Sequence, residues 1–169
     1  MSLIDAASPI RDVVFICHGN RCRSPFAMLL FEREARTRNS DARASSAGFV
    51  VPGQSSPTQA LATAKEHGID LTDHRSRLIN IRELEAADLV VVMDSRQRQA
   101  IQNLLDPKPV EPLVLGDLDP LNTGRRTIAD PWGRETEVFV DSYERIARCV
   151  QELVRRIAAA PTGSTAERR

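Results

Sequence analysis

Short apolar segments alternate with amphipathic segments along this chain. Val, Ile and Leu concentrate in segments 13–17, 89–93 and 110–115, which predicts buried strands there, and a further strand is expected over 43–47. Helices are expected over 25–38, 57–67, 81–86, 96–104 and 134–159. Between residues 116 and 133 lies a loop rich in Asp, Pro, Gly and Thr, long enough to act as a lid over a site.

The alternation of strands and helices predicts the fold class. It is typical of an α/β protein with a doubly wound, mainly four-stranded parallel sheet and helices on both faces. With 169 residues, the chain is long enough for one such domain. We expect that domain over residues 12–160, after a flexible extension over 1–11 and before a disordered tail over 161–169.

The segment between the first strand and the first helix contains the most informative residues. Cys17 ends the strand, and Ser24 followed by Pro25 is typical of a helix N-cap with proline at the first helical position. Gly19 allows the backbone to approach a ligand closely, and Asn20 tolerates a left-handed conformation. The segment therefore predicts a tight loop at a helix N-terminus, where unpaired backbone N–H groups favour anions.

A thiol and an arginine determine the chemistry of this loop. A helix N-terminus and a nearby arginine both stabilise a thiolate, so we expect Cys17 to be ionised at neutral pH. The planar guanidinium of Arg23 can bind two phosphoryl oxygens at once. Taken singly, these residues are also typical of a buried core cysteine and a solvated arginine. The agreement of strand, loop and helix start favours a nucleophile held against a phosphoryl group.

Composition and charge exclude several other classes of protein. The chain has 23 basic and 23 acidic residues, so nothing predicts a nucleic-acid partner. Three cysteines, two of them in the loop, indicate a reducing compartment. The N-terminal segment does not have the pattern of a signal peptide and no apolar run is long enough to span a bilayer, so we expect a cytoplasmic protein without membrane insertion. The histidines have no metal-ligand spacing, so neither a metal nor another cofactor is expected.

The same loop resembles the signature of a known family. The string Cys17-x-Gly19-Asn20-x-Cys22-Arg23-Ser24 is similar to that of the low-molecular-weight protein tyrosine phosphatases. Further motifs follow in the family's order: Ser46-Ala47-Gly48, residues 68–77, residues 87–94 and Asp130-Pro131-Trp132-Gly133. The resemblance extends over residues 13–157 and implies a phosphatase loop between the first strand and the first helix.

The resemblance implies a phosphomonoesterase that works through a phosphocysteine. Cys17 would be the nucleophile, and Arg23 with the loop amides would hold the phosphoryl oxygens. Ser24 would donate a hydrogen bond to the sulfur, and Asp130 would protonate the leaving oxygen. From the residues alone, Asp130 is one of three aspartates followed by proline, so its role as general acid rests on the resemblance.

The resemblance also implies supporting roles for neighbouring residues. Asn20 would organise the loop together with Ser46 and His74, and Cys22 could form a reversible disulfide with Cys17. The substrate would contact loop residues and aromatic walls, which are His18, Gly19, Asn20, Arg21, Cys22, Trp132 and Phe49. An apolar residue at position 49 is equally typical of the core.

Arg21 and Trp132 bear on the choice of substrate. The position of Arg21 is commonly aliphatic in the family's tyrosine phosphatases and threonine in its protein-arginine phosphatases. Arg21 would repel the cationic guanidinium of phosphoarginine, and Trp132 could stack on the ring of phosphotyrosine. We therefore expect a phosphotyrosine-containing protein as substrate, and the resemblance implies a bacterial tyrosine kinase as partner.

Three alternative functions stay open. A protein-arginine phosphatase would share the family's loop and mechanism. An arsenate reductase would also share the fold, but it needs additional cysteines downstream, and after Cys22 the chain has only Cys149. A non-catalytic phospho-binding or redox-sensing module could keep the loop, but it would not need the nucleophile, arginine, serine and aspartate together.

Overall fold

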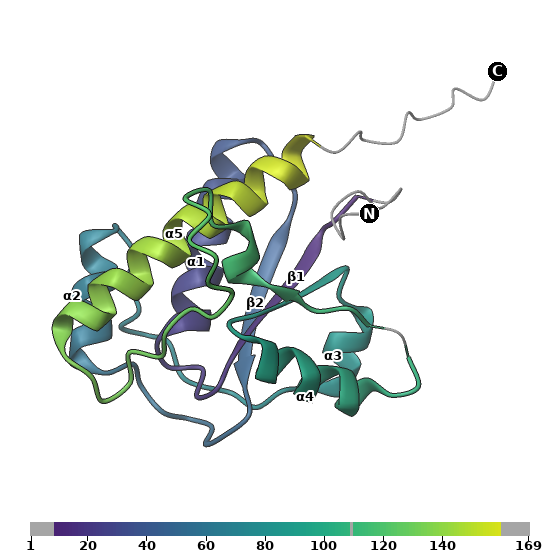
Figure 1. Ribbon diagram of the computed structural model, residues 1–169, viewed down its shortest axis with the longest axis horizontal. Coiled ribbons are helices and arrows are strands. Elements are labelled where there is room, and N and C mark those ends of the chain that lie inside the picture. Colours follow the sequence, from purple (N-terminus) through teal and green to yellow (C-terminus); the bar gives the residue numbers. More distant parts are fainter. Residues whose placement is uncertain (1–8, 109, 160–169) are drawn as a thin grey trace.

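The computed structural model describes residues 9–108 and 110–159, which form a four-stranded sheet with helices on both faces (Figure 1). The strands are β1 (Asp12–Cys17), β2 (Arg43–Gly48), β3 (Leu89–Val92) and β4 (Leu113–Val114). They pair in parallel in the order β2-β1-β3-β4. The predicted α/β fold with a four-stranded parallel sheet is therefore confirmed. The expected tail over 161–169 and most of the expected extension over 1–11 lie outside the described residues.

Strand β1 lies inside the sheet and is apolar on both faces. Val13, Phe15 and Cys17 belong to the larger of two hydrophobic clusters, whereas Val14 and Ile16 belong to the smaller one. All five side chains are buried. This pattern is typical of a parallel strand covered by helices on both sides. It leaves Cys17 at the carboxyl end of the sheet.

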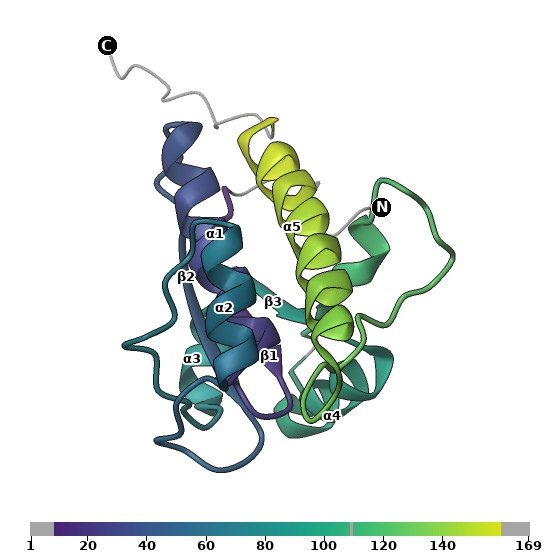
Figure 2. The ribbon, with the colours of Figure 1, turned by 90° about the vertical axis from the view of Figure 1, so that its left-hand side faces the viewer.

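Three helices cover the face of the larger cluster, namely α1 (Arg23–Thr37), α2 (Thr58–Glu66) and α5 (Thr136–Ala159). Figure 2 shows α2 and α5 in front of the strands with α1 partly behind α2, and α5 packs against both of the other helices. The opposite face is covered by α3 (Ile81–Ala86) and α4 (Ser95–Leu105), whose buried leucine and isoleucine side chains join the smaller cluster. None of the helices in the described part of the chain is long and apolar enough to cross a membrane.

Helix α5 packs closely against the beginning of α1. Phe139, Tyr143, Ile146 and Val150 recur every three or four residues along α5 and are buried, as expected for an amphipathic helix. The ring of Tyr143 stacks on that of Phe26 in α1, with 4.1 Å between ring centroids and an interplanar angle of 8°. Such a pair contributes about 0.5–1.5 kcal/mol beyond its buried area. The stack fixes α5 beside the loop that follows β1.

The segment that precedes α5 is fastened to that helix by two arginines. Asp119 lies 2.9 Å from Arg145 and 3.2 Å from Arg148, and its carboxylate is almost completely buried. Arg145 also donates hydrogen bonds to the backbone carbonyls of Thr127 and Arg125. The predicted loop over 116–133 is therefore held against α5 along much of its length.

The first helix begins earlier than the sequence predicts. Helix α1 starts at Arg23, its N-cap residue is Cys22, and no side chain caps it. Ser24 lies inside the first turn, so its predicted role as N-cap is wrong, and its hydroxyl contacts the sulfur of Cys17 instead. Pro25 fits the third helical position because the first four N–H groups of a helix have no partner within it.

The last strand is shorter than the predicted segment 110–115. Only Leu113 and Val114 pair with β3. Pro112 has no N–H group to donate to a neighbouring strand, and Leu115 begins a 3-10 turn, η1 (Leu115–Leu118). The other predicted elements agree with the structure to within two residues at each end.

Candidate active site

Cys17 and the loop after it line a cavity at the carboxyl end of β1. The cavity has a volume of about 300 Å³. Its walls come from the loop after β1, the segment after β2 and the segment before α5, and the lining residues are Cys17, His18, Gly19, Arg21, Cys22, Arg23, Val50, Val51, Gln54, Asp130 and Trp132. Ligands of open α/β sheets bind at this edge. The fold therefore brings the predicted nucleophile, arginine and general acid to one cavity.

Asn20 organises the loop from a fully buried position. Its φ of 52° is in the left-handed region, which asparagine tolerates better than most residues. Its side-chain amide nitrogen donates to the hydroxyls of Ser24 and Ser46, each over 2.9 Å. Its side-chain oxygen accepts the backbone N–H of Arg77 over 2.9 Å, which fixes the orientation of the amide. The loop conformation thus depends on residues from three separate segments.

The hydroxyl of Ser24 lies 3.0 Å from the sulfur of Cys17. Because this hydroxyl already accepts a hydrogen bond from Asn20, its proton is free to point at the sulfur. Ser24 is therefore oriented to donate to a Cys17 thiolate. A hydrogen bond to a charged acceptor is stronger than one between neutral groups.

The side chain of His74 supports the loop by a hydrogen bond to the loop backbone. Its Nε2 lies 2.7 Å from the carbonyl oxygen of Asn20, so Nε2 must carry the proton. Burial lowers the pKa of His74 below its ordinary value, and the charges of Arg75 and Arg77 act in the same direction. The hydrogen bond to Asn20 opposes this shift without cancelling it. His74 is therefore a neutral hydrogen-bond donor at neutral pH.

Every second carbonyl group of the loop accepts a hydrogen bond from outside it, namely those of residues 18, 20 and 22. The donors are the backbone N–H of Phe49 (2.8 Å), the Nε2–H of His74 (2.7 Å) and the hydroxyl of Tyr143 (2.9 Å). The C=O and the following N–H of a trans peptide point in opposite directions. Because each of these carbonyls points at its donor outside the loop, the N–H of the next residue points the opposite way. These N–H groups belong to residues 19, 21 and 23. Such a set of inward N–H groups can bind the oxygens of an anion.

Arg23 connects the loop to the segment that carries Asp130. Its guanidinium is buried, and one Nη donates to the carbonyl of Ile128 over 3.0 Å. The other Nη lies 2.8 Å from the carboxylate of Asp130, whose side chain is 44% exposed. These two contacts fix the plane of the guanidinium and hold Asp130 at the mouth of the cavity.

Arg21 and Trp132 form one wall of the cavity. The guanidinium of Arg21 lies 4.2 Å from the centroid of the Trp132 ring, and its Nε donates to the carbonyl of Ser55 over 2.8 Å. A cation–π contact of this kind contributes roughly 0.5–1 kcal/mol at an exposed site. The stack joins the loop after β1 to the segment before α5 on the side of the cavity that faces solvent.

Phe49 does not form the second aromatic wall that the sequence suggests. Its side chain packs against the smaller hydrophobic cluster, and its backbone N–H holds the carbonyl of His18. Val50 and Val51 line the cavity in its place, and both are exposed. The prediction was wrong because β2 ends at Gly48 and the chain then turns, so that residue 49 faces the core and the next two residues face the cavity.

The two other cysteines are held as thiols. Burial, together with the charges of Cys17 and Asp130, raises the pKa of Cys22 to about 12. Burial is also the main reason why the pKa of Cys149 is raised to about 12. Cys22 lines the cavity, whereas Cys149 lies in the larger hydrophobic cluster.

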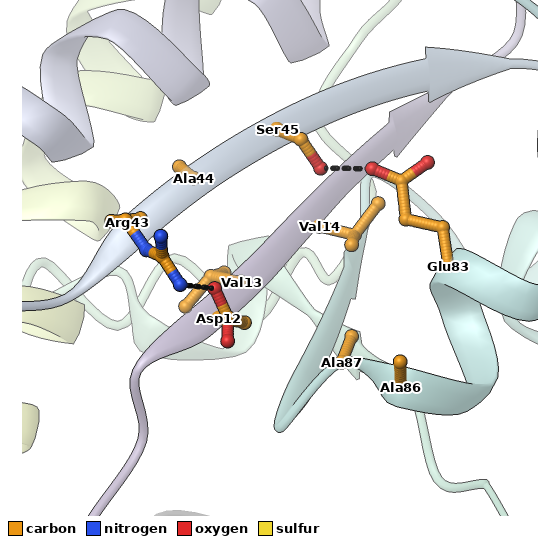
Figure 3. Close-up of a pocket in the computed structure, with 9 residues that line it drawn as sticks. All are labelled: Asp12, Val13, Val14, Arg43, Ala44, Ser45, Glu83, Ala86 and Ala87. Atoms are coloured by element: carbon orange, nitrogen blue, oxygen red, sulfur yellow. Dashed lines mark hydrogen bonds and ion pairs between the residues drawn. The ribbon is translucent and has the colours of Figure 1, made fainter.

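A second cavity, of about 230 Å³, lies at the amino ends of β1 and β2 (Figure 3). Figure 3 shows Arg43 paired with Asp12 and the hydroxyl of Ser45 donating to Glu83. Glu83 also binds both Nη atoms of Arg77, at 2.8 and 2.7 Å. This end of the sheet is opposite to the candidate active site. The ion pair of Glu83 with Arg77 affects the candidate active site only indirectly, because the backbone N–H of Arg77 donates to the side chain of Asn20.

Several supporting residues were missed by the sequence reasoning. Tyr143 and Arg77 hold the loop from distant segments, and no local pattern marks them. Gly48 is a third case, because a Cβ there would lie 2.8 Å from both the N of Asn20 and the O of His18. Only the position of Gly48 within the motif that starts at Ser46 could have indicated it.

Known proteins resemble this chain over most of its length. The profile of the family described as low molecular weight phosphotyrosine protein phosphatase matches residues 12–162. A probable low molecular weight protein-tyrosine-phosphatase, EpsP of Ralstonia nicotianae, is 31% identical over 151 residues, covering 89% of this chain and 98% of that protein. A protein-arginine-phosphatase of Bacillus subtilis is 26% identical and covers 86% and 96% of the two chains.

Solved structures have the same fold. The YwlE arginine phosphatase, in a mutant with a phosphorylated active-site serine, has a TM-score of 0.79 at 25% identity, covering 88% of this chain and 96% of that chain. A low molecular weight protein tyrosine phosphatase of T. tengcongensis has a TM-score of 0.77 at 28% identity, covering 86% and 98%. The chain therefore belongs to the low molecular weight phosphotyrosine protein phosphatase family.

Proposed function

We propose that this cysteine-dependent phosphatase hydrolyses phosphotyrosine in proteins through a phosphocysteine on Cys17. The Cys17 thiolate attacks phosphorus, the ester P–O bond breaks, and the leaving oxygen takes a proton from Asp130. Water then attacks phosphorus and gives a proton to Asp130, the P–S bond breaks, and the thiolate re-forms. Arg23 and the N–H groups of the loop hold the phosphoryl oxygens in both steps.

One observation carries this proposal, namely that Cys17, Arg23 and Asp130 line the same cavity. Ser24 supports the second step, because its hydrogen bond to sulfur makes the thiolate a better leaving group. The phosphorylated serine in the active site of the YwlE arginine phosphatase supports a covalent route in this family.

The cavity wall supports phosphotyrosine as the substrate. Val50, Val51 and Trp132 provide apolar and aromatic surface for a phenyl ring. Arg21 places a fixed positive charge in the same wall, where it would repel the guanidinium of a phosphoarginine. We infer that the protein acts in the cytoplasm on phosphoproteins and opposes a bacterial tyrosine kinase.

The test is phosphate release by the reduced protein from matched phosphotyrosine, phosphoserine and phosphoarginine peptides. We expect turnover of the phosphotyrosine peptide only. Cys17→Ser should abolish this activity, and Asp130→Ala should lower kcat by about a hundredfold, the usual contribution of a general acid. Asp117→Ala is a matched control, because Asp117 pairs with Arg126 away from the cavity and its loss should leave kcat unchanged.

Other outcomes would redirect the proposal. Preferential turnover of phosphoarginine would contradict the role given to Arg21. Turnover that survives in Cys17→Ser would contradict the covalent route. Failure to release phosphate from any peptide, combined with arsenate-dependent oxidation of Cys17, would favour an arsenate reductase.

A further inference from the structure

Two consecutive residues of α5 contact the two halves of the candidate active site. The hydroxyl of Ser142 donates to the carbonyl of Ala129 over 2.9 Å, directly before Asp130. The hydroxyl of Tyr143 donates to the carbonyl of Cys22 over 2.9 Å, directly before Arg23. Side chains of consecutive helical residues point about 100° apart. One turn of α5 can therefore reach both segments.

Tyr143 holds one peptide plane of the loop after β1. The side chain is completely buried, and its ring is fixed by the stack on Phe26, so the direction of the hydroxyl is determined. By accepting this hydrogen bond, the carbonyl of Cys22 is kept pointing towards α5. The N–H of Arg23 then points the opposite way. Burial raises the pKa of Tyr143 further above its ordinary value, so the hydroxyl remains a donor.

Ser142 holds the backbone next to the proposed general acid. Its side chain is buried although Ala129 and Asp130 are exposed. Arg23 binds the same backbone segment through the carbonyl of Ile128 and the carboxylate of Asp130. Without Ser142, that exposed stretch keeps its contact with Arg23 but loses its attachment to α5 at residue 129.

We propose that Ser142 and Tyr143 are positioning residues with different targets. Tyr143 positions the phosphate-binding N–H groups of the loop, and Ser142 positions the general acid. Helix α5 then sets the geometry between the nucleophile loop and Asp130. Neither residue touches the cavity, so both act through the backbone. The proposal rests on the proposed phosphatase mechanism for Ser142, whereas the part that concerns Tyr143 requires only that the loop binds an oxyanion.

The test compares Tyr143→Phe and Ser142→Ala in two measurements. The first is the affinity for inorganic phosphate by titration calorimetry, and the second is kcat/KM for aryl phosphates with leaving groups of different pKa. Tyr143→Phe keeps the ring stack, and we expect phosphate affinity to fall about tenfold, the effect of one buried neutral hydrogen bond. Its kcat/KM should fall by a similar factor for every leaving group.

Ser142→Ala should behave differently. We expect unchanged phosphate affinity, little change in kcat/KM for the most acidic leaving groups, and a loss of about tenfold for the most basic ones, because only these need a well-placed proton donor. Ser142→Thr retains the hydroxyl and should restore the leaving-group dependence of the wild type.

Thr63→Val is the control for the loss of a buried hydroxyl. Thr63 is buried in α2, its hydroxyl donates to the carbonyl of Gln59, and neither residue is among those that line the cavity. If Tyr143→Phe and Ser142→Ala change only the free energy of unfolding, as Thr63→Val should, both residues are merely structural and the proposal is wrong. If the wild type binds phosphate but hydrolyses no aryl phosphate, the proposed function fails while the result for Tyr143 still stands.

Discussion

Arg23 and Asp130 are 2.8 Å apart, although 107 positions separate them in the chain. The pair joins the residue that would bind the phosphoryl oxygens to the residue that would protonate the leaving group. Its geometry is supported on both sides, because Arg23 also holds the carbonyl of Ile128. The guanidinium therefore serves as the link between the loop after β1 and the segment before α5.

The planar, two-nitrogen geometry of the Arg23 guanidinium should matter more for catalysis than its positive charge. Arg23→Lys keeps the positive charge, but one ammonium group cannot bind a phosphoryl group bidentately and hold Ile128 as well. We expect kcat/KM for an aryl phosphate to fall by about a hundredfold or more. Arg155→Lys, at an exposed ion pair on α5, should leave kcat/KM unchanged. An Arg23→Lys enzyme with the activity of the wild type would contradict this role.

Ser24 should affect the second chemical step. Ser24→Ala removes the donor to the sulfur of Cys17, so the thiolate becomes a poorer leaving group. We expect kcat to fall by about tenfold to a hundredfold, as for a hydrogen bond to a charged group. In rapid-quench experiments the first turnover should remain fast and phosphocysteine should accumulate. A loss of the first fast turnover would instead indicate that Ser24 acts on the first step.

The three cysteines should differ in reactivity. We expect iodoacetamide at pH 7 to modify Cys17 first, because it lines the cavity beside Arg23 and faces the Ser24 hydroxyl, whereas Cys22 in the same cavity is held as a thiol. Cys22 and Cys149, each with a pKa raised to about 12 mainly by burial, should react only after unfolding. Mass spectrometry of the labelled peptides measures this order, and inorganic phosphate should slow the labelling of Cys17. Equal labelling of Cys17 and Cys22 in the native protein would contradict it.

His74 should make stability depend on pH. Burial lowers the pKa of folded His74, whereas in the unfolded chain the residue titrates near its ordinary value of about 6.5. As the pH falls below that value, the unfolded chain takes up a proton that the folded protein does not, so the free energy of unfolding decreases. His74→Gln retains an N–H donor for Asn20 and does not titrate. Urea denaturation from pH 7.5 to pH 5 should show a shallower decrease for this variant than for the wild type.

Asp119 should stabilise the fold more than its neighbour Asp117. Burial opposes ionisation of Asp119, but hydrogen bonds from Arg148, the N–H of Leu121 and Arg145 outweigh it and lower the pKa. Asp119→Ala leaves Arg145 and Arg148 without their buried partner, and we expect the free energy of unfolding to fall by about 3 kcal/mol.

Asp117→Ala is the comparison for this measurement, because it breaks the partly exposed pair with Arg126 and should cost less than about 1 kcal/mol. Chemical denaturation measures both variants. Equal losses would show that the buried carboxylate contributes no more than a surface ion pair.

The sequence alone was sufficient to predict the fold, and it pointed to Cys17 and Arg23 as the reactive residues of the loop after β1. Strand β1 is apolar on both faces, which identifies a buried parallel strand, and Cys17 and Arg23 belong to one contiguous motif. Such local patterns predict strands, loops and contiguous motifs correctly, because residues that are neighbours in the sequence remain neighbours in any fold. The same reasoning noted that Asn20 tolerates a left-handed conformation, and the structure has Asn20 in one.

Local reasoning failed where a contact formed in the folded protein competes with the preference of a residue within its own turn or loop. Ser24 has the local preference of an N-cap, but the sulfur of Cys17 takes its hydrogen bond. Phe49 is aromatic and near the site, but the core takes its side chain. In each case the tertiary contact was decisive, because the side chain gains more from that partner than from its local alternative.

The sequence by itself thus determined the order of strands and helices along the chain, and it predicted Cys17 as the nucleophile with Arg23 beside it. Only the tertiary structure decided which donors hold the loop carbonyls, which residues form the wall, and how Asp130 meets Arg23. Tyr143 lies 121 positions from Cys22, and nothing near either residue reveals the hydrogen bond between them. Such contacts depend on how whole helices pack on the sheet, and packing is a property of the assembled core rather than of any short segment.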